Sequence, residues 1–111
     1  MFSVLEELLR IIKKKNSYSV KKKSYTFQLL NNKNLCLKKF KEEALELYNA
    51  AKYKNNKKNI VHEAADLFYH FFVLLQLKKI PIHLIMKELK KRQKISGIQE
   101  KKNRKKNVRS K

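Results

Sequence analysis

The chain has 111 residues, which is enough for one domain with a short tail. One glycine and one proline argue against a turn-rich β fold, and the abundant Leu, Lys, Glu, Ala and Ile favour helices, so we predict an all-α protein. The formal net charge of +20 is typical of proteins that bind nucleic acid or a membrane surface. Codon drift is the alternative that we favour, because Lys, Asn, Ile, Phe and Tyr all use AT-rich codons and lysines are readily solvated.

The apolar spacing predicts helices joined by short polar segments. Ser3 with Glu6 reads as a capping box for the first helix, and Ser24 is the expected N-cap of the second. Asn59 is the expected N-cap of the fourth helix, and Pro81 suits the first turn of the last. The predicted helices form an antiparallel bundle of four to five helices and cover residues 2–13, 24–30, 35–53, 59–78 and 81–94.

Several features bear on compartment and domain limits. The segment 59–78 is apolar on nearly every side, which predicts a central helix, and its acidic residues and histidines make it a poor membrane span. No signal peptide is expected, because Glu6 and Glu7 break the N-terminal apolar run. The single cysteine, Cys36, reads as a buried thiol in a reducing compartment. We expect a cytoplasmic protein with no membrane partner, a domain over residues 1–102 and a basic, disordered tail over 103–111.

Two acidic pairs occupy consecutive predicted helices. Glu43 and Glu46 are three residues apart and share a helix face, and Glu63 and Asp66 repeat that spacing on the next helix. A short polar turn joins these helices, so they should pack antiparallel. Each pair lies roughly 15 Å along its helix from the turn. The four carboxylates should therefore meet across the helix interface.

Four facing carboxylates resist ionisation unless a cation offsets their charge. An all-oxygen set suits Mg²⁺ or Mn²⁺, and Mg²⁺ that keeps waters binds phosphate oxygens, so the pattern indicates phosphate-ester chemistry. The alternative is that EEALE (42–46) is a solvated face paired with neighbouring lysines. His70 is expected to pack or to hydrogen-bond to Asp66, and His62 points about 100° away from Glu63 around the helix. The candidate phosphate contacts are Lys38, Lys39 and Arg92.

An ordered set of motifs resembles a known family over roughly residues 4–102. EExxE followed by ExxD resembles the all-α, MazG-like nucleoside-triphosphate pyrophosphohydrolases. The full set resembles one branch, the phosphoribosyl-ATP pyrophosphatases of histidine biosynthesis. Two positions depart from that family: Lys41 replaces a usual glycine before the glutamates, and Gln93 replaces a usual histidine after the arginine. The matching motifs are SYT (24–26), KKFKEEALEL (38–47), HEAADLFYHFFVLLQ (62–76) and ELKKRQKISGIQEK (88–101).

The resemblance implies Mg²⁺-dependent hydrolysis of phosphoribosyl-ATP to phosphoribosyl-AMP and pyrophosphate by a homodimeric helical enzyme. Tyr25, Thr26 and Lys39 match positions expected to bind substrate, and Glu42 matches the leading glutamate. Two rival functions stay open. One is a house-cleaning nucleoside-triphosphate pyrophosphohydrolase of the same fold, and the other is a basic helical protein that binds nucleic acid. The resemblance assigns metal binding to Glu43, Glu46, Glu63 and Asp66, and the expected catalytic set is Glu42, Glu43 and Glu46.

Overall fold

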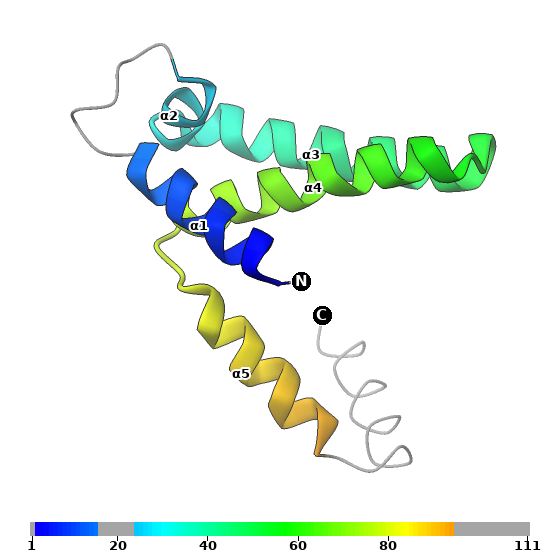
Figure 1. Ribbon diagram of the computed structural model, residues 1–111. Coiled ribbons are helices and arrows are strands. Elements are labelled where there is room, and N and C mark those ends of the chain that lie inside the picture. Colours follow the sequence, from blue (N-terminus) through cyan, green and yellow to red (C-terminus); the bar gives the residue numbers. More distant parts are fainter. Residues whose placement is uncertain (1, 16–23, 95–111) are drawn as a thin grey trace, which may run out of the picture. The chain divides into compact units, whose positions relative to one another are not determined.

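The computed structural model describes residues 2–15 and 24–94, and the elements in these ranges are helices (Figure 1). This confirms the all-α prediction. The chain divides into two compact units, Met1–Ile80 and Pro81–Lys111. Residues 95–102 of the predicted domain and the predicted tail over 103–111 lie outside the described residues.

The first two helices begin with different N-terminal contacts. In α1 (Ser3–Lys15) the Phe2 carbonyl accepts from the amides of Leu5 and Glu6 at 3.1 and 3.2 Å. Ser3 therefore lies inside the first turn, and the predicted capping box is wrong by one position. In α2 (Tyr25–Leu30), the Ser24 hydroxyl accepts from the Phe27 amide at 3.3 Å, which confirms the predicted cap.

Asparagine side chains begin the two long helices, α3 (Lys33–Asn49) and α4 (Lys57–Leu77). Asn32 accepts from the Leu35 amide at 3.1 Å, so α3 starts within the predicted break at 31–34. Asn56 accepts from the Asn59 amide at 3.2 Å. The prediction that Asn59 caps α4 is therefore wrong, because it lies inside the first turn and an earlier asparagine already satisfies its amide.

A π-helix, η1 (Ala50–Lys54), continues α3 into the turn. Asn55 then takes the left-handed conformation at φ 45° and donates its amide to the Ala50 carbonyl at 2.9 Å. Asparagine tolerates this region better than most residues, which suits it to the end of a helix. The short turn makes α3 and α4 run antiparallel and side by side, as predicted (Figure 1).

The core of the first unit lies where α4 packs against α1, α2 and α3. The largest fully buried side chains are Ile12, Leu29, Cys36 and Val73. Each belongs to a different helix, so one small core holds four helices together. The predicted burial of Cys36 is confirmed, and burial raises the pKa of its thiol.

Among the described helices, α4 alone is long and apolar enough by length and composition to cross a membrane. The core helix of a soluble protein passes the same test. The helix packs against α1, α2, α3 and η1, and the charges of its Glu63 and Asp66 act on Glu43 of α3. Its central packing gives a physical reason for its apolar composition.

The second unit contains α5 (Ile82–Gln93). Pro81 occupies the N-cap position with φ −67° and ψ 141°, one residue before the predicted first turn. Proline fits there because it lacks an amide proton and its ring fixes φ. Arg92 Nε donates to Glu88 Oε2 at 3.1 Å on this helix.

Candidate metal centre

The antiparallel hairpin of α3 and α4 brings three carboxylates together. Glu43 and Glu46 share one face of α3, and Glu63 reaches them from α4. One carboxylate oxygen from each of the three lies within 4.8 Å of the other two. The two acidic pairs are equally far from the turn along their helices, so they meet at the same height in the hairpin, as predicted from the sequence.

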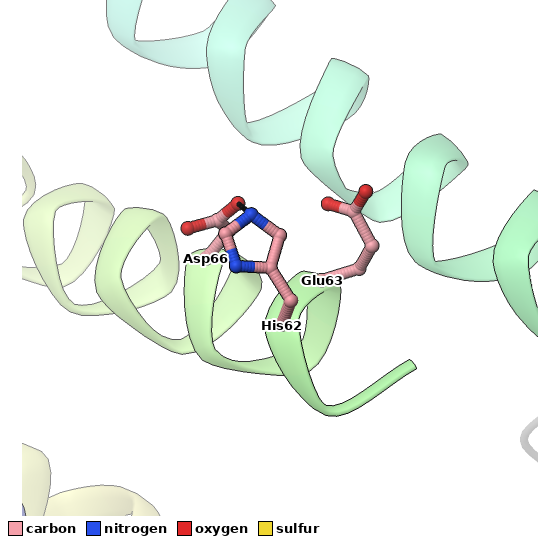
Figure 2. A group of neighbouring side chains, drawn as sticks. All are labelled: His62, Glu63 and Asp66. Carbon is pink, nitrogen blue, oxygen red and sulfur yellow. Dashed lines mark ion pairs between the residues drawn. The ribbon is translucent and has the colours of Figure 1, made fainter. Parts of the chain in front are cut away.

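The fourth predicted carboxylate, Asp66, has a different near neighbour. His62 Nε2 lies 3.4 Å from Asp66 Oδ2, and both are within 4.8 Å of a Glu63 oxygen. Figure 2 shows His62 and Asp66 side by side while Glu63 extends toward α3. Asp66 still raises the pKa of Glu43 through its charge. The four carboxylates therefore form one electrostatic group, and Glu63 belongs to both of its halves.

Burial and mutual repulsion perturb Glu43 most. Burial, a hydrogen bond with Glu46 and the charges of Glu46, Asp66 and Glu63 together raise the pKa of Glu43 to about 7. Two buried oxygens, Glu43 Oε2 and Glu63 Oε1, have no hydrogen-bond partner among the described residues. Buried acceptors without partners are costly. Oxygen donors of this kind are the ligands that Mg²⁺ and Mn²⁺ prefer.

Glu42 stands apart from this group. Its Oε1 lies 3.3 Å from Lys39 Nζ, and both side chains are well exposed at 43% and 37%. The hydrogen bond and charge of Glu42 raise the pKa of Lys39. The solvated ion-pair interpretation of the acidic run therefore holds for Glu42, while Glu43 and Glu46 meet the α4 carboxylate.

A polar aromatic wall joins α2 to α4 beside these carboxylates. Thr26 is buried, and its hydroxyl shares a short hydrogen bond with the Tyr69 hydroxyl. Tyr25 is 45% exposed, stacks on Tyr69 with ring centroids 6.4 Å apart, and meets His70 Nε2 at 3.3 Å through its hydroxyl. His70 Nδ1 donates to the backbone carbonyl of Asp66 at 3.0 Å, not to its carboxylate.

The sequence analysis missed Tyr69. Its signal was the spacing of Asp66, Tyr69 and His70 at i, i+3 and i+4, which places all three on one face of α4. Lys38 is exposed on α3, and Arg92 lies on α5 in the other unit. The roles of Tyr25, Thr26 and both basic residues in substrate binding stay predictions, and so do the catalytic and metal roles of the carboxylates.

Comparison with known proteins gives consistent matches. A family model described as phosphoribosyl-ATP pyrophosphohydrolase matches residues 5–93. The phosphoribosyl-ATP pyrophosphatase of Vesicomyosocius okutanii is 40% identical over 105 residues, which cover 94% of this chain and 98% of that protein. That of Allorhizobium ampelinum is 42% identical over 82 residues, or 73% and 78% of the two chains.

A longer relative also matches. The histidine biosynthesis bifunctional protein HisIE of Helicobacter hepaticus is 41% identical over 106 residues, which cover 95% of this chain and 45% of that protein. The family-model match over residues 5–93 includes both acidic pairs and the aromatic wall.

Proposed function

The chain belongs to the phosphoribosyl-ATP pyrophosphohydrolase family, and we propose that it hydrolyses phosphoribosyl-ATP to phosphoribosyl-AMP and pyrophosphate, the second step of histidine biosynthesis. The observation that carries the site is the group of mutually repelling carboxylates between α3 and α4, of which Glu43, Glu63 and Asp66 are partly buried and Glu46 is exposed. The substrate of this step is a water-soluble nucleotide, and we place the protein in the cytoplasm.

The residues present fit a divalent cation. Glu43, Glu46, Glu63 and Asp66 would hold Mg²⁺ or Mn²⁺, because they offer oxygen ligands, carry excess negative charge and leave two buried oxygens without partners. When bound, the cation supplies positive charge for the phosphate oxygens and a lowered pKa for a water molecule.

Side chains near the carboxylates are assigned the other roles in the reaction. Glu42 lies one position before Glu43 and outside the group of Glu43, Glu46 and Glu63. We assign it to accept a proton from the attacking water or to orient that water. Lys39 holds Glu42 in place at 3.3 Å and adds positive charge near the phosphates, with Lys38 beside it.

Pyrophosphate release from phosphoribosyl-ATP in Mg²⁺ tests the proposal. Glu46→Gln keeps the side-chain size and removes one charge, and we expect activity to fall roughly 100-fold. Glu7→Gln makes the same change on an exposed face of α1 and should leave activity unchanged. Turnover of deoxynucleoside triphosphates with none of phosphoribosyl-ATP would instead identify a house-cleaning enzyme of the same fold.

We also propose a homodimer formed through the hairpin. Exposed apolar side chains recur at helical spacing on α3 (Leu37, Leu45 and Tyr48) and on α4 (Val61 and Phe68). Large apolar side chains exposed on one face of a helix are typical of interaction sites. Light scattering at micromolar concentration should give twice the mass of the 13.4 kDa chain, and Leu45→Lys should lower it toward the monomer. A monomeric wild type would contradict this.

A further inference from the structure

His70 connects α2 to the carboxylate-bearing turn of α4 through two hydrogen bonds. Nδ1 lies 3.0 Å from the Asp66 carbonyl oxygen, and Nε2 lies 3.3 Å from the Tyr25 hydroxyl. The imidazole is buried at 7% exposure. Its ring also packs edge-on against both tyrosines, with centroids 6.1 Å from Tyr25 and 4.9 Å from Tyr69.

These two contacts fix the direction of both hydrogen bonds. A carbonyl oxygen only accepts, so the ring proton of the neutral imidazole sits on Nδ1. Nε2 then has a lone pair and no proton, and the Tyr25 hydroxyl must donate to it. The Tyr25 oxygen is left with lone pairs only, and it can accept one further hydrogen bond but cannot offer one.

Through His70, the Tyr25 hydroxyl is linked to the backbone of Asp66, one of the four carboxylate residues. Burial raises the pKa of this hydroxyl most, the charge of Lys39 lowers it, and the charges of Glu43 and Glu42 raise it. The side chain is 45% exposed, so a ligand at the carboxylates can reach it. Phosphate oxygens are acceptors and make a poor partner for an oxygen that also only accepts.

We propose that His70 is a positioning residue that holds the Tyr25 hydroxyl as a hydrogen-bond acceptor, so that Tyr25 binds a sugar hydroxyl of the substrate and not its phosphates. This inference rests on the proposed function for the identity of the substrate. The assignment of Tyr25 as donor to His70 does not depend on that function, because it follows from the two hydrogen bonds of His70 alone.

The neighbouring tyrosine supplies a matched control. Tyr69 lies on α4 next to His70 and stacks on Tyr25, but its hydroxyl is engaged by the buried Thr26. Tyr69→Phe therefore removes a phenol hydroxyl from the same interface without touching the acceptor that faces the ligand. We expect it to leave the proton of His70 on Nδ1 and the Tyr25–His70 hydrogen bond in place.

Histidine tautomers test the polarity without any assay of activity. Long-range ¹H–¹⁵N spectra of ¹⁵N-histidine-labelled protein at pH 8 should show three imidazoles, one for each histidine of the chain. The signal missing from His70→Gln identifies His70, which should carry its proton on Nδ1. Tyr25→Phe should shift Nε2 and spare Nδ1. A proton on Nε2, alone or together with Nδ1, overturns the proposal.

Steady-state kinetics test the positioning role by separating the two hydrogen bonds. Tyr25→Phe should raise KM for phosphoribosyl-ATP roughly three- to tenfold with kcat within about twofold of wild type. His70→Asn keeps an N–H for the Asp66 carbonyl but loses the acceptor, so its KM should rise equally. His70→Gln can accept from Tyr25 and should stay near wild type. The opposite order of Asn and Gln would show that only the carbonyl contact matters and would overturn the proposal.

Inorganic triphosphate tests the class of ligand group, because it has phosphates and no sugar. As a competitive inhibitor, it should bind wild type and Tyr25→Phe equally. Weaker inhibition of Tyr25→Phe would place the tyrosine on a phosphate and overturn the assignment. A wild type without phosphoribosyl-ATP hydrolysis would contradict the proposed function, and the tautomer measurement would still decide the role of His70.

Discussion

Without a divalent cation, the acidic group between α3 and α4 should destabilise the protein as the pH rises, and Glu46→Gln should relieve part of this cost. The Glu43 carboxyl has a pKa of about 7 against an ordinary value of 4.5. The folded state therefore binds more protons than the unfolded chain between these values. The free energy of unfolding consequently falls as the pH rises from 4.5 through 7, and it stays reduced above 7.

The structure sets the size of this effect. One pKa unit corresponds to about 1.4 kcal/mol, so the full difference corresponds to about 3.5 kcal/mol at most. Solvent screening of a partly exposed group reduces this to about 2 kcal/mol. Two charges within 4.8 Å repel by about 1 kcal/mol in a water-like dielectric. Glu46→Gln should therefore raise the free energy of unfolding at pH 8 by about 1 kcal/mol. The part of the penalty that comes from the burial of Glu43 should remain.

Urea denaturation in EDTA at intervals from pH 5 to 8 measures both quantities. Subtracting the Glu46→Gln curve from the wild-type curve removes the contribution of other titrating groups. Glu42→Gln is the matched control, because its exposed pair with Lys39 should contribute under about 0.5 kcal/mol. Added Mn²⁺ should stabilise wild type more than Glu46→Gln. Parallel curves in EDTA, or a less stable Glu46→Gln at pH 8, would refute this reasoning.

Three further predictions concern stability and are measured by urea denaturation. Thr26→Val leaves the Tyr69 hydroxyl without its buried partner and should cost about 1–3 kcal/mol; an unchanged stability would contradict that hydrogen bond. Asn56→Ala should cost about 1 kcal/mol by removing the α4 cap, whereas Asn59→Ala should cost less, and the reverse order would support the sequence-based cap. Leu29→Ala should cost about 2–5 kcal/mol because Leu29 is fully buried, and a loss below that range would mean the site collapses around the smaller side chain.

The sequence predicted features that depend on spacing along one helix or across one short turn. Ser24 caps α2 because capping needs only a hydroxyl and an amide three residues later. The meeting of Glu43 and Glu46 with Glu63 followed from equal distances to the turn, since both helices have the same rise per residue. Motif order likewise identified the family without structural information.

Where several nearby residues could equally begin a helix, only the structure showed which one does. Asn32 and Asn56 begin helices that the sequence started at later residues, because several asparagines near each turn could serve as caps. The π-helix at Ala50–Lys54 was also not predicted from the sequence.

Spacing fixes the angle of a side chain on its own helix, and the sequence thereby determined which carboxylates share a face and at what height they meet. Only packing decides how far each helix rotates about its axis, and hence which neighbour a side chain finds. Glu42 and Asp66 pair with Lys39 and His62, three and four residues away on their own helices. Packing also buried His70 against the hydroxyl of Tyr25 on α2, a partner distant in the chain, while its other hydrogen bond goes to the local carbonyl of Asp66 on α4.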